Sequence, residues 1–265
     1  MTSGVIMADT IHEINNNILT ITLNRPDRLN AMSNEMRTEL LRLLTKQESD
    51  LNVRTIVIRA NGRGFCSGAD VQPDEILTRR TTIGDQVENG INQIIRRLTS
   101  LPVPVIAAVN GPAAGAGVSL ALASDLMLVN RDAAFHISFA RIGAVMDGGN
   151  SWFMTRALGP RRTAALALTG GTFGAEQALA WGLAHKVVDN DQLWMAAEEL
   201  ACELASGPTT ALGLIKKEVA MAATLDLSSA LSLEAECQQM AFNTEDFAEA
   251  IDARHRRRRP AFRGY

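Results

Sequence analysis

Two segments rich in glycine and alanine are the part of this chain most suited to chemistry. Residues 62–70 read Gly-Arg-Gly-Phe-Cys-Ser-Gly-Ala-Asp, and residues 110–117 read Asn-Gly-Pro-Ala-Ala-Gly-Ala-Gly. Each follows an apolar run typical of a strand, at 55–58 and at 103–109. Small side chains leave backbone N–H groups uncovered, and two such loops at neighbouring strand ends can point those groups at one oxygen. The pair predicts an oxyanion hole that stabilises an enolate formed from a thioester or a similar carbonyl.

The elements that would position these loops alternate between strand and helix. Strand-like spacing of apolar residues predicts strands at 18–23, 55–59, 103–109, 126–129 and 134–137. Ser33 is predicted to cap a first helix, and the segment 72–82 reads as a polar loop. Further helices are predicted at 83–99, 115–123, from Gly148 to Leu158, 160–168 and 175–181. Repeated β-to-α units predict an α/β fold with a stacked core over residues 1–195.

The last part of the chain, residues 196–265, is predicted to be helical. Helical spacing places helices near 191–205, 209–222, 226–240 and 244–254. This tail is apolar enough that we expect it to pack against another subunit or to cover the site.

Composition excludes several classes of protein. The chain has 265 residues, a net charge of −3 and 46% hydrophobic residues, which suits a large core and gives no general attraction to nucleic acid. The three cysteines have no metal-ligand spacing, which favours reduced thiols in a cytoplasmic protein. No signal peptide and no membrane span are predicted. The basic run at 254–259 leaves nucleic-acid binding as a remote alternative.

Four motifs together resemble the crotonase superfamily, also called the enoyl-CoA hydratase/isomerase family. They lie at 24–31, 65–70, 110–117 and 170–178, and the resemblance extends over nearly the whole chain. It implies a ββα-spiral core with a C-terminal helical trimerisation region. It also implies an acyl-CoA thioester substrate, no metal, no cofactor beyond the coenzyme A of the substrate, and a homotrimer or a dimer of trimers.

The resemblance also implies which residues contact the substrate. Arg28 matches a position that often contacts a CoA phosphate, and the main chain from Ser67 to Asp70 matches the loop that binds adenine. The thioester oxygen would meet two N–H donors, each beside a glycine that allows close approach: Ala69 with Gly68, and Ala116 with Gly115.

The chain departs from the family's hydratases at their two catalytic glutamates. These positions fall on Ser119 and Phe139, which we therefore assign to the substrate-binding wall. Neither side chain can act as a carboxylate. Because losing one acid/base group costs about 10²–10⁴-fold in rate, two-carboxylate hydration is not expected.

Asp147 is the candidate catalytic base. Family members that move a double bond place an acid just before a glycine pair, as Asp147 stands before Gly148 and Gly149. A 1,3 proton shift needs one carboxylate and an oxyanion hole, because no water is activated. Apolar neighbours would raise the pKa of Asp147 and a helix N-terminus would lower it. The alternative is that Asp147 only caps a helix.

Three interpretations of function follow. The preferred one is an enoyl-CoA isomerase with Asp147 as the proton shuttle. The second is an enoyl-CoA hydratase of the fatty-acid β-oxidation type that uses atypical acids. The third is an acyl-CoA-binding relative without catalytic activity, suggested by the loss of both glutamates.

Overall fold

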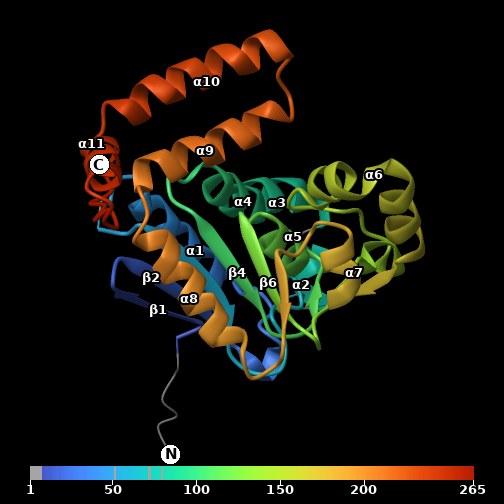
Figure 1. The fold of residues 1–265 in the computed structure, drawn as a ribbon. Coiled ribbons are helices and arrows are strands. Elements are labelled where there is room, and N and C mark those ends of the chain that lie inside the picture. Colours follow the sequence, from blue (N-terminus) through green and yellow to red (C-terminus); the bar gives the residue numbers. More distant parts are fainter. Residues whose placement is uncertain (1–7, 51, 71–72, 79) are drawn as a thin grey trace, which may run out of the picture.

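A computed structural model describes residues 8–50, 52–70, 73–78 and 80–265 of the chain. Its centre is a six-stranded sheet in the order β1-β2-β3-β4-β6-β9 (Figure 1). β1 pairs antiparallel with β2, and every other neighbouring pair is parallel. The strands are β1 (Thr10–Asn15), β2 (Ile18–Leu23), β3 (Thr55–Ala60), β4 (Val105–Val109), β6 (Leu126–Asn130) and β9 (Lys186–Val188).

A smaller three-stranded sheet lies beyond the first. Its order is β5-β7-β8, made of β5 (Ala113–Ala114), β7 (Ala134–His136) and β8 (Thr172–Gly174). Phe135 and Phe173 stack across β7 and β8 with ring centroids 4.9 Å apart. This sheet holds the second glycine loop, because β5 is part of that loop.

One face of the large sheet is covered by α8 (Leu193–Ala205). Successive side chains of a strand point to opposite faces, so alternate residues of β4 meet α8. The helix contributes small residues that allow close approach. The buried cluster consists of Ile18, Val57, Ile106, Ala108, Leu128, Val188, Leu193, Ala197, Ala201 and Ala205.

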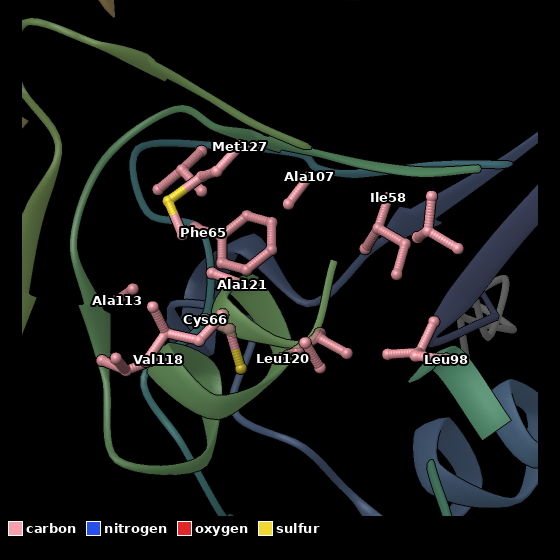
Figure 2. Packing of buried hydrophobic residues seen from close by; sticks show 14 of the residues in the cluster. Ile58, Phe65, Cys66, Leu98, Ala107, Ala113, Val118, Leu120, Ala121 and Met127 are labelled. Atoms are coloured by element: carbon pink, nitrogen blue, oxygen red, sulfur yellow. The ribbon is translucent and has the colours of Figure 1, made fainter. Parts of the chain in front are cut away.

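The other face packs against α1 (Asn34–Gln47), α4 (Ile91–Ser100) and α5 (Ala116–Leu122). Ser33 caps α1, because its hydroxyl accepts a hydrogen bond from the Met36 amide at 3.0 Å. Figure 2 shows how tightly this core is filled beside the first glycine loop, where the Phe65 ring lies between Met127 and Ala121. The predicted α/β core is confirmed.

The remaining helices surround this core. They are α2 (Pro73–Thr78), α3 (Ile83–Asn89), α6 (Asn150–Thr169), α7 (Ala175–Ala180), α9 (Thr209–Ala222), α10 (Leu227–Phe242) and α11 (Glu245–His255). Short 3-10 helices occupy Pro26–Arg28, Arg80–Thr82 and Ser138–Ile142. α6 bends at Gly159, which has non-helical backbone angles, so the two helices predicted on either side of this residue are confirmed.

The structure differs from three expectations of secondary structure. The predicted loop at 72–82 contains α2 and a 3-10 helix, and a proline at the first position of α2 suits a helix start. The predicted helix at 83–99 breaks at Gly90 into α3 and α4. A side chain at Gly90 would bring its Cβ within 2.6 Å of the Gln86 carbonyl oxygen. Four strands, β1, β5, β8 and β9, were not predicted.

The C-terminal helices form an arm beside the core. α9 passes close to the starts of β4 and β6 with α10 beside it, and α11 brings the chain back to the first turns of α9 (Figure 1). α8 spans the predicted boundary at residues 195 and 196 and packs on the sheet. The division at this boundary stays a prediction. Among the described residues, no helix is both long and apolar enough to cross a membrane.

Candidate active site

The two glycine loops are bound to each other by backbone pairing. Cys66 and Ala113 form an isolated parallel bridge, and the Ala114 amide donates to the Cys66 carbonyl at 2.9 Å. The chains approach so closely that a Cβ on Gly117 would lie 2.1 Å from the Cys66 carbonyl oxygen. The loops therefore form one rigid unit, as the sequence predicted for neighbouring strand ends.

Buried side chains anchor this unit in the core. Phe65 and Cys66 of the first loop are fully buried, and Figure 2 shows Cys66 beside Val118 of α5. Burial raises the pKa of the Cys66 thiol to about 12. Such a thiol stays protonated, so Cys66 packs in the core and is not a nucleophile.

The Ala69 amide points away from its neighbouring strand. Ala69 pairs with Met32 in a parallel bridge: the Met32 amide donates to the Gly68 carbonyl at 2.8 Å, and the Asp70 amide donates to the Met32 carbonyl at 3.1 Å. In such a pair, the residue between the two bonds points its own N–H to the opposite side. The Ala69 amide has no hydrogen-bond acceptor within the described part of the chain.

The Ala116 amide is the first of α5. The Gly115 carbonyl accepts from the Val118 amide at 3.0 Å, whereas the Ala116 amide finds no acceptor among residues 8–50, 52–70, 73–78 and 80–265. The first N–H groups of a helix have no partner inside it, and the helix dipole makes this end attractive to negative charge. This amide is therefore suited to an oxyanion.

The two amides lie at adjoining points of the paired loops. Gly68 has φ +96°, and a Cβ there would lie 3.0 Å from the Ala114 carbonyl oxygen and 3.6 Å from the Ala116 nitrogen. On the other side, the Phe139 ring packs against Gly115, where a Cβ would come within 3.7 Å of the ring. Glycine is thus required at position 68, and the space beside the two amides is bounded by an aromatic side chain.

One carboxylate oxygen of Asp147 is buried without a partner. Its Oδ1 atom is buried and makes no hydrogen bond to any described residue. Burial raises the pKa of Asp147 above its ordinary value. The N-cap of α6 is Gly149 and no side chain caps this helix, so the alternative reading of Asp147 as a helix cap is wrong.

Hydrogen bonds to its backbone carbonyl hold Asp147 in place. The buried Ser119 hydroxyl donates to the Asp147 carbonyl at 3.1 Å. The Asn150 amide nitrogen of the main chain donates to the same carbonyl at 3.0 Å. Gly148 packs on Ser119 so closely that a Cβ would lie 2.7 Å from its hydroxyl oxygen. The Oδ1 atom is left without a hydrogen bond while the backbone of Asp147 is fixed.

The residues assigned to coenzyme A lie near the first loop. Arg28 and Ser67 are exposed neighbours, and the Ser67 hydroxyl donates to the Arg28 carbonyl at 3.3 Å. Asp70 forms an ion pair with Arg25, with Nη1 and Oδ2 2.7 Å apart. The structure therefore brings Arg28 and Ser67 together on the surface beside the loop that contains Gly68 and Ala69.

A cavity of about 1030 Å³ borders the turn that follows Asp147. Gly148 and Gly149 form part of its wall, but Ala69, Ala116 and Asp147 do not line it. Its opposite wall comes from α9, α10 and the C-terminal residues. Side chains that line it include Ile95, Trp152, Phe153, Lys216, Met240 and Tyr265.

Three further titratable or charged side chains have structural partners. The His136 ring nitrogen Nδ1 lies 3.0 Å from the Thr172 hydroxyl. Asp125 accepts from the Val105 amide at 2.8 Å and so holds the start of β4. In the basic run, Arg258 pairs with Glu249 and Asp252 of α11. No group of three or more potential metal ligands occurs among the described residues.

A family model described as "Enoyl-CoA hydratase/isomerase" matches residues 13–265. The chain belongs to this family. It is therefore an enzyme of the crotonase superfamily, and the predicted resemblance is confirmed. The fold agrees with this assignment, because solved structures of enoyl-CoA hydratase/isomerases superimpose on nearly the whole chain.

Three members of the enoyl-CoA hydratase/isomerase family illustrate the similarity. The 1,2-epoxyphenylacetyl-CoA isomerase of Escherichia coli is 39% identical over 98% of this chain and 100% of its own length. A protein of Rhodobacter capsulatus named "Probable enoyl-CoA hydratase" is 36% identical over 96% of this chain and 97% of its own. The crystal structure of an enoyl-CoA hydratase/isomerase from Cupriavidus metallidurans superimposes with a TM-score of 0.90 at 30% identity, over 98% of this chain and 97% of the other.

One residue of the site was missed by sequence reasoning. The Asn150 side chain is fully buried beneath the two loops, and its Nδ2 atom donates to the Ser119 hydroxyl at 2.6 Å and to the Gly115 carbonyl at 3.2 Å. The only signal in the sequence is an amide directly after a glycine pair at a helix start. That signal is equally typical of an ordinary helix N-terminus.

Proposed function

We propose that this enzyme moves the carbon–carbon double bond of an enoyl-CoA thioester, with Asp147 as the proton shuttle. The observation that supports this most directly is a buried carboxylate oxygen without a hydrogen-bond partner, on a turn that Ser119 and Asn150 join to the helix start carrying the Ala116 amide. A carboxylate in this environment has a raised pKa and is therefore a better base than a solvated one.

The reaction begins with the thioester carbonyl of a 3-enoyl-CoA beside the Ala69 and Ala116 amides. The Asp147 carboxylate takes a proton from C2, and the electron pair of that C–H bond passes into the carbonyl to form an enolate. The two amides donate hydrogen bonds to the enolate oxygen. Asp147, now protonated, returns the proton at C4, and the double bond is left between C2 and C3.

The oxyanion hole supplies a large share of the rate. A single donor of this kind contributes about 2.7–4 kcal/mol of transition-state stabilisation. Gly68 and Gly115 allow the oxygen to reach these donors, because neither has a side chain in the way. No residue other than Asp147 has to transfer a proton, so one carboxylate is sufficient.

The residues at the hydratases' glutamate positions favour isomerisation over hydration. Ser119 is fully buried and donates to the Asp147 carbonyl, so it orients the base. Phe139 packs against Gly115 and excludes water from that side of the thioester. Water activation would need a carboxylate where this aromatic ring lies, and hydration is therefore the less suited reaction.

The substrate is a coenzyme A ester with no further cofactor. One relative acts, by its name, on an epoxyphenylacetyl-CoA, which supports a CoA thioester as the substrate here. Arg28 and Ser67 are exposed beside the first loop, and Arg28 is suited to a CoA phosphate. Asp70 supports that loop through its ion pair with Arg25. The predicted cytoplasmic location of the enzyme stays a prediction.

The enzyme assembles as a homotrimer or as a dimer of trimers. Apolar side chains are exposed along the C-terminal helices, and burying such a surface between subunits is favourable. These side chains are Ile215, Val219, Leu227, Leu231, Met240 and Ile251. A molar mass of three or six chains is expected by light scattering, and the mass of a single chain would contradict this assembly.

The test compares trans-3-enoyl-CoA with crotonyl-CoA for the wild type and the Asp147→Asn variant. We expect the wild type to convert the 3-enoyl ester and to hydrate crotonyl-CoA poorly. The variant should bind the ester but lose about 10²–10⁴-fold in turnover, because amide nitrogen and oxygen do not accept the proton. Equal isomerisation by both proteins would reject Asp147 as the base.

The same assay separates the two alternatives. Fast formation of 3-hydroxyacyl-CoA from crotonyl-CoA would favour a hydratase that uses other acids. Binding of both esters without turnover of either would favour the acyl-CoA-binding protein without catalytic activity.

A further inference from the structure

The Asn150 side chain connects the peptide that carries the Ala116 amide with the turn that carries Asp147. It is completely buried at the start of α6, and its Nδ2 atom donates to the Ser119 hydroxyl at 2.6 Å and to the Gly115 carbonyl at 3.2 Å. A third, longer contact of 3.4 Å reaches the Asp147 carbonyl. Two of these partners are carbonyl oxygens, which only accept, so the NH₂ group of the side chain must face them.

The Gly115 carbonyl belongs to the same peptide unit as the Ala116 amide. The C=O and N–H groups of a trans peptide lie in one plane and point in opposite directions. A donor that fixes the Gly115 carbonyl therefore fixes the direction of the Ala116 N–H. Hydrogen bonds in such a chain also polarise one another, so a donor on the carbonyl strengthens the amide as a donor.

The other end of the network reaches the base. The Ser119 hydroxyl accepts from Asn150 Nδ2 and donates to the Asp147 carbonyl at 3.1 Å. The Asn150 main-chain amide donates to that same carbonyl at 3.0 Å. Asn150 thus fixes the backbone of Asp147 and the plane of the peptide that carries the Ala116 N–H.

We propose that Asn150 is a positioning residue that sets the direction of the Ala116 N–H relative to the Asp147 carboxylate. This inference rests on the proposed function, because it gives that carboxylate and that amide their roles. It concerns a residue with no proton to transfer and no contact with the thioester. Its loss should misdirect the oxyanion donor while the substrate still binds.

The test measures polarisation of the thioester directly. A saturated acyl-CoA labelled with ¹³C at the thioester carbonyl is bound to the wild type, and its C=O stretch is compared with that of the free ester by difference infrared spectroscopy. The wild type should shift this band to lower frequency. Asn150→Ala should lose at least half of the shift, lower kcat by about 10–100-fold and change KM by less than threefold.

Two further variants make the result specific. Asn150→Leu removes the NH₂ group but keeps a side chain of similar size, so it replaces Asn150→Ala if the smaller residue leaves a protein that does not fold. Ser119→Ala breaks the link to the Asp147 carbonyl but keeps the bond from Asn150 to Gly115. It should therefore lower kcat while keeping the full carbonyl shift.

The outcomes distinguish this inference from the proposed function. The contrary result is a folded Asn150→Ala or Asn150→Leu variant that shifts the C=O band as far as the wild type does and keeps kcat within twofold. That result would overturn the role of Asn150 alone. A carbonyl shift in the wild type without any isomerisation of 3-enoyl esters would overturn the proposed reaction but not the positioning of the donor. A wild type without a carbonyl shift would overturn both.

Discussion

Asp147 combines a fixed backbone with one unsatisfied carboxylate oxygen. Its carbonyl accepts from Ser119 and from the Asn150 amide, whereas its Oδ1 atom is buried without a partner in the described chain. A buried charge without a partner is costly, and the group binds a proton more readily as a result. The destabilisation is confined to the Oδ1 atom of Asp147. That atom is the one that would take the proton from carbon.

This cost predicts how stability depends on pH. Burial raises the pKa of Asp147 in the folded state above its unfolded value near 3.8. The folded protein therefore binds this proton more tightly, and its stability falls as the pH rises from the unfolded pKa through the folded pKa. We expect Asp147→Asn to be more stable than the wild type at pH 7, and the difference to shrink below pH about 4.

Urea unfolding at a fixed protein concentration across this pH range measures the difference. A variant with the same pH dependence as the wild type would show that Asp147 is solvated in the folded enzyme. Thr163→Val changes a buried residue in the second half of α6 without altering a titrating group, and gives a control for a general loss of stability.

The sequence predicted the residues of the site better than the contacts between them. Gly68 and Gly115 were assigned from their motifs, and the structure confirms that their two loops adjoin. Asn150 was missed because its importance lies in bonds to Ser119 and to the Gly115 carbonyl, 31 and 35 residues away. No local pattern reports such contacts. The helix-cap reading of Asp147 failed for a related reason, since Gly149 takes that position in three dimensions.

At the scale of elements, the two glycine loops act as one unit because their backbones touch. The bridge between Cys66 and Ala113 depends on the absence of a side chain at Gly117, the second residue of α5. The long apolar strands that lead into the loops were predictable from their composition. β1 was not predicted because all but its first residue are exposed, and β5, β8 and β9 are too short to show a period.

Gly117→Ala should separate the two loops. Its Cβ would lie 2.1 Å from the Cys66 carbonyl oxygen, and that oxygen belongs to the backbone and cannot rotate away. We expect a loss of about 1–3 kcal/mol of stability, as for other overpacked sites. Isomerase activity should fall further than stability alone explains, because the Ala116 amide moves with the loop.

Gly84→Ala is the matched control for this substitution. Gly84 lies in α3, and a Cβ there meets nothing within 4 Å. Alanine is favoured over glycine in a helix, so this variant should be as stable as the wild type or more stable by up to about 1 kcal/mol. Thermal unfolding and the isomerase assay on both variants provide the measurement. Full activity in Gly117→Ala would mean that the loops tolerate separation.

At the scale of the whole molecule, two cationic side chains fasten the C-terminal arm to the core. Arg54, just before β3, donates to the Thr209 hydroxyl at 2.7 Å and to the Phe262 carbonyl at 3.2 Å. Lys216 of α9 donates to the Leu98 carbonyl and pairs with Asp125, both at 2.8 Å. The arm therefore bonds near the starts of β3 and β4, whose opposite ends lead into the glycine loops.

The ion pair between Lys216 and Asp125 is largely buried, with side-chain exposures of 9% and 28%. Burial lowers the pKa of Lys216 and raises that of Asp125, and the attraction between the two charges opposes both shifts. Such a pair contributes little in comparison with an apolar pair of the same shape. Removal of one partner, however, leaves the other charge uncompensated.

Lys216→Met should therefore destabilise the protein by about 3–5 kcal/mol, because Asp125 and the Leu98 carbonyl lose their partner. Adding Asp125→Asn should restore part of this loss, since the amide is neutral and its oxygen can still accept from the Val105 amide. Chemical unfolding at one protomer concentration measures both, with the exposed neighbour Lys217→Met as a control expected within about 0.5 kcal/mol of the wild type. If Lys216→Met instead costs less than about 1 kcal/mol, the apolar contacts of α9 hold the arm without the ion pair.

Limited proteolysis tests whether the arm of Lys216→Met has detached from the core. A detached arm would be cleaved between α8 and α9 while the sheet stays intact.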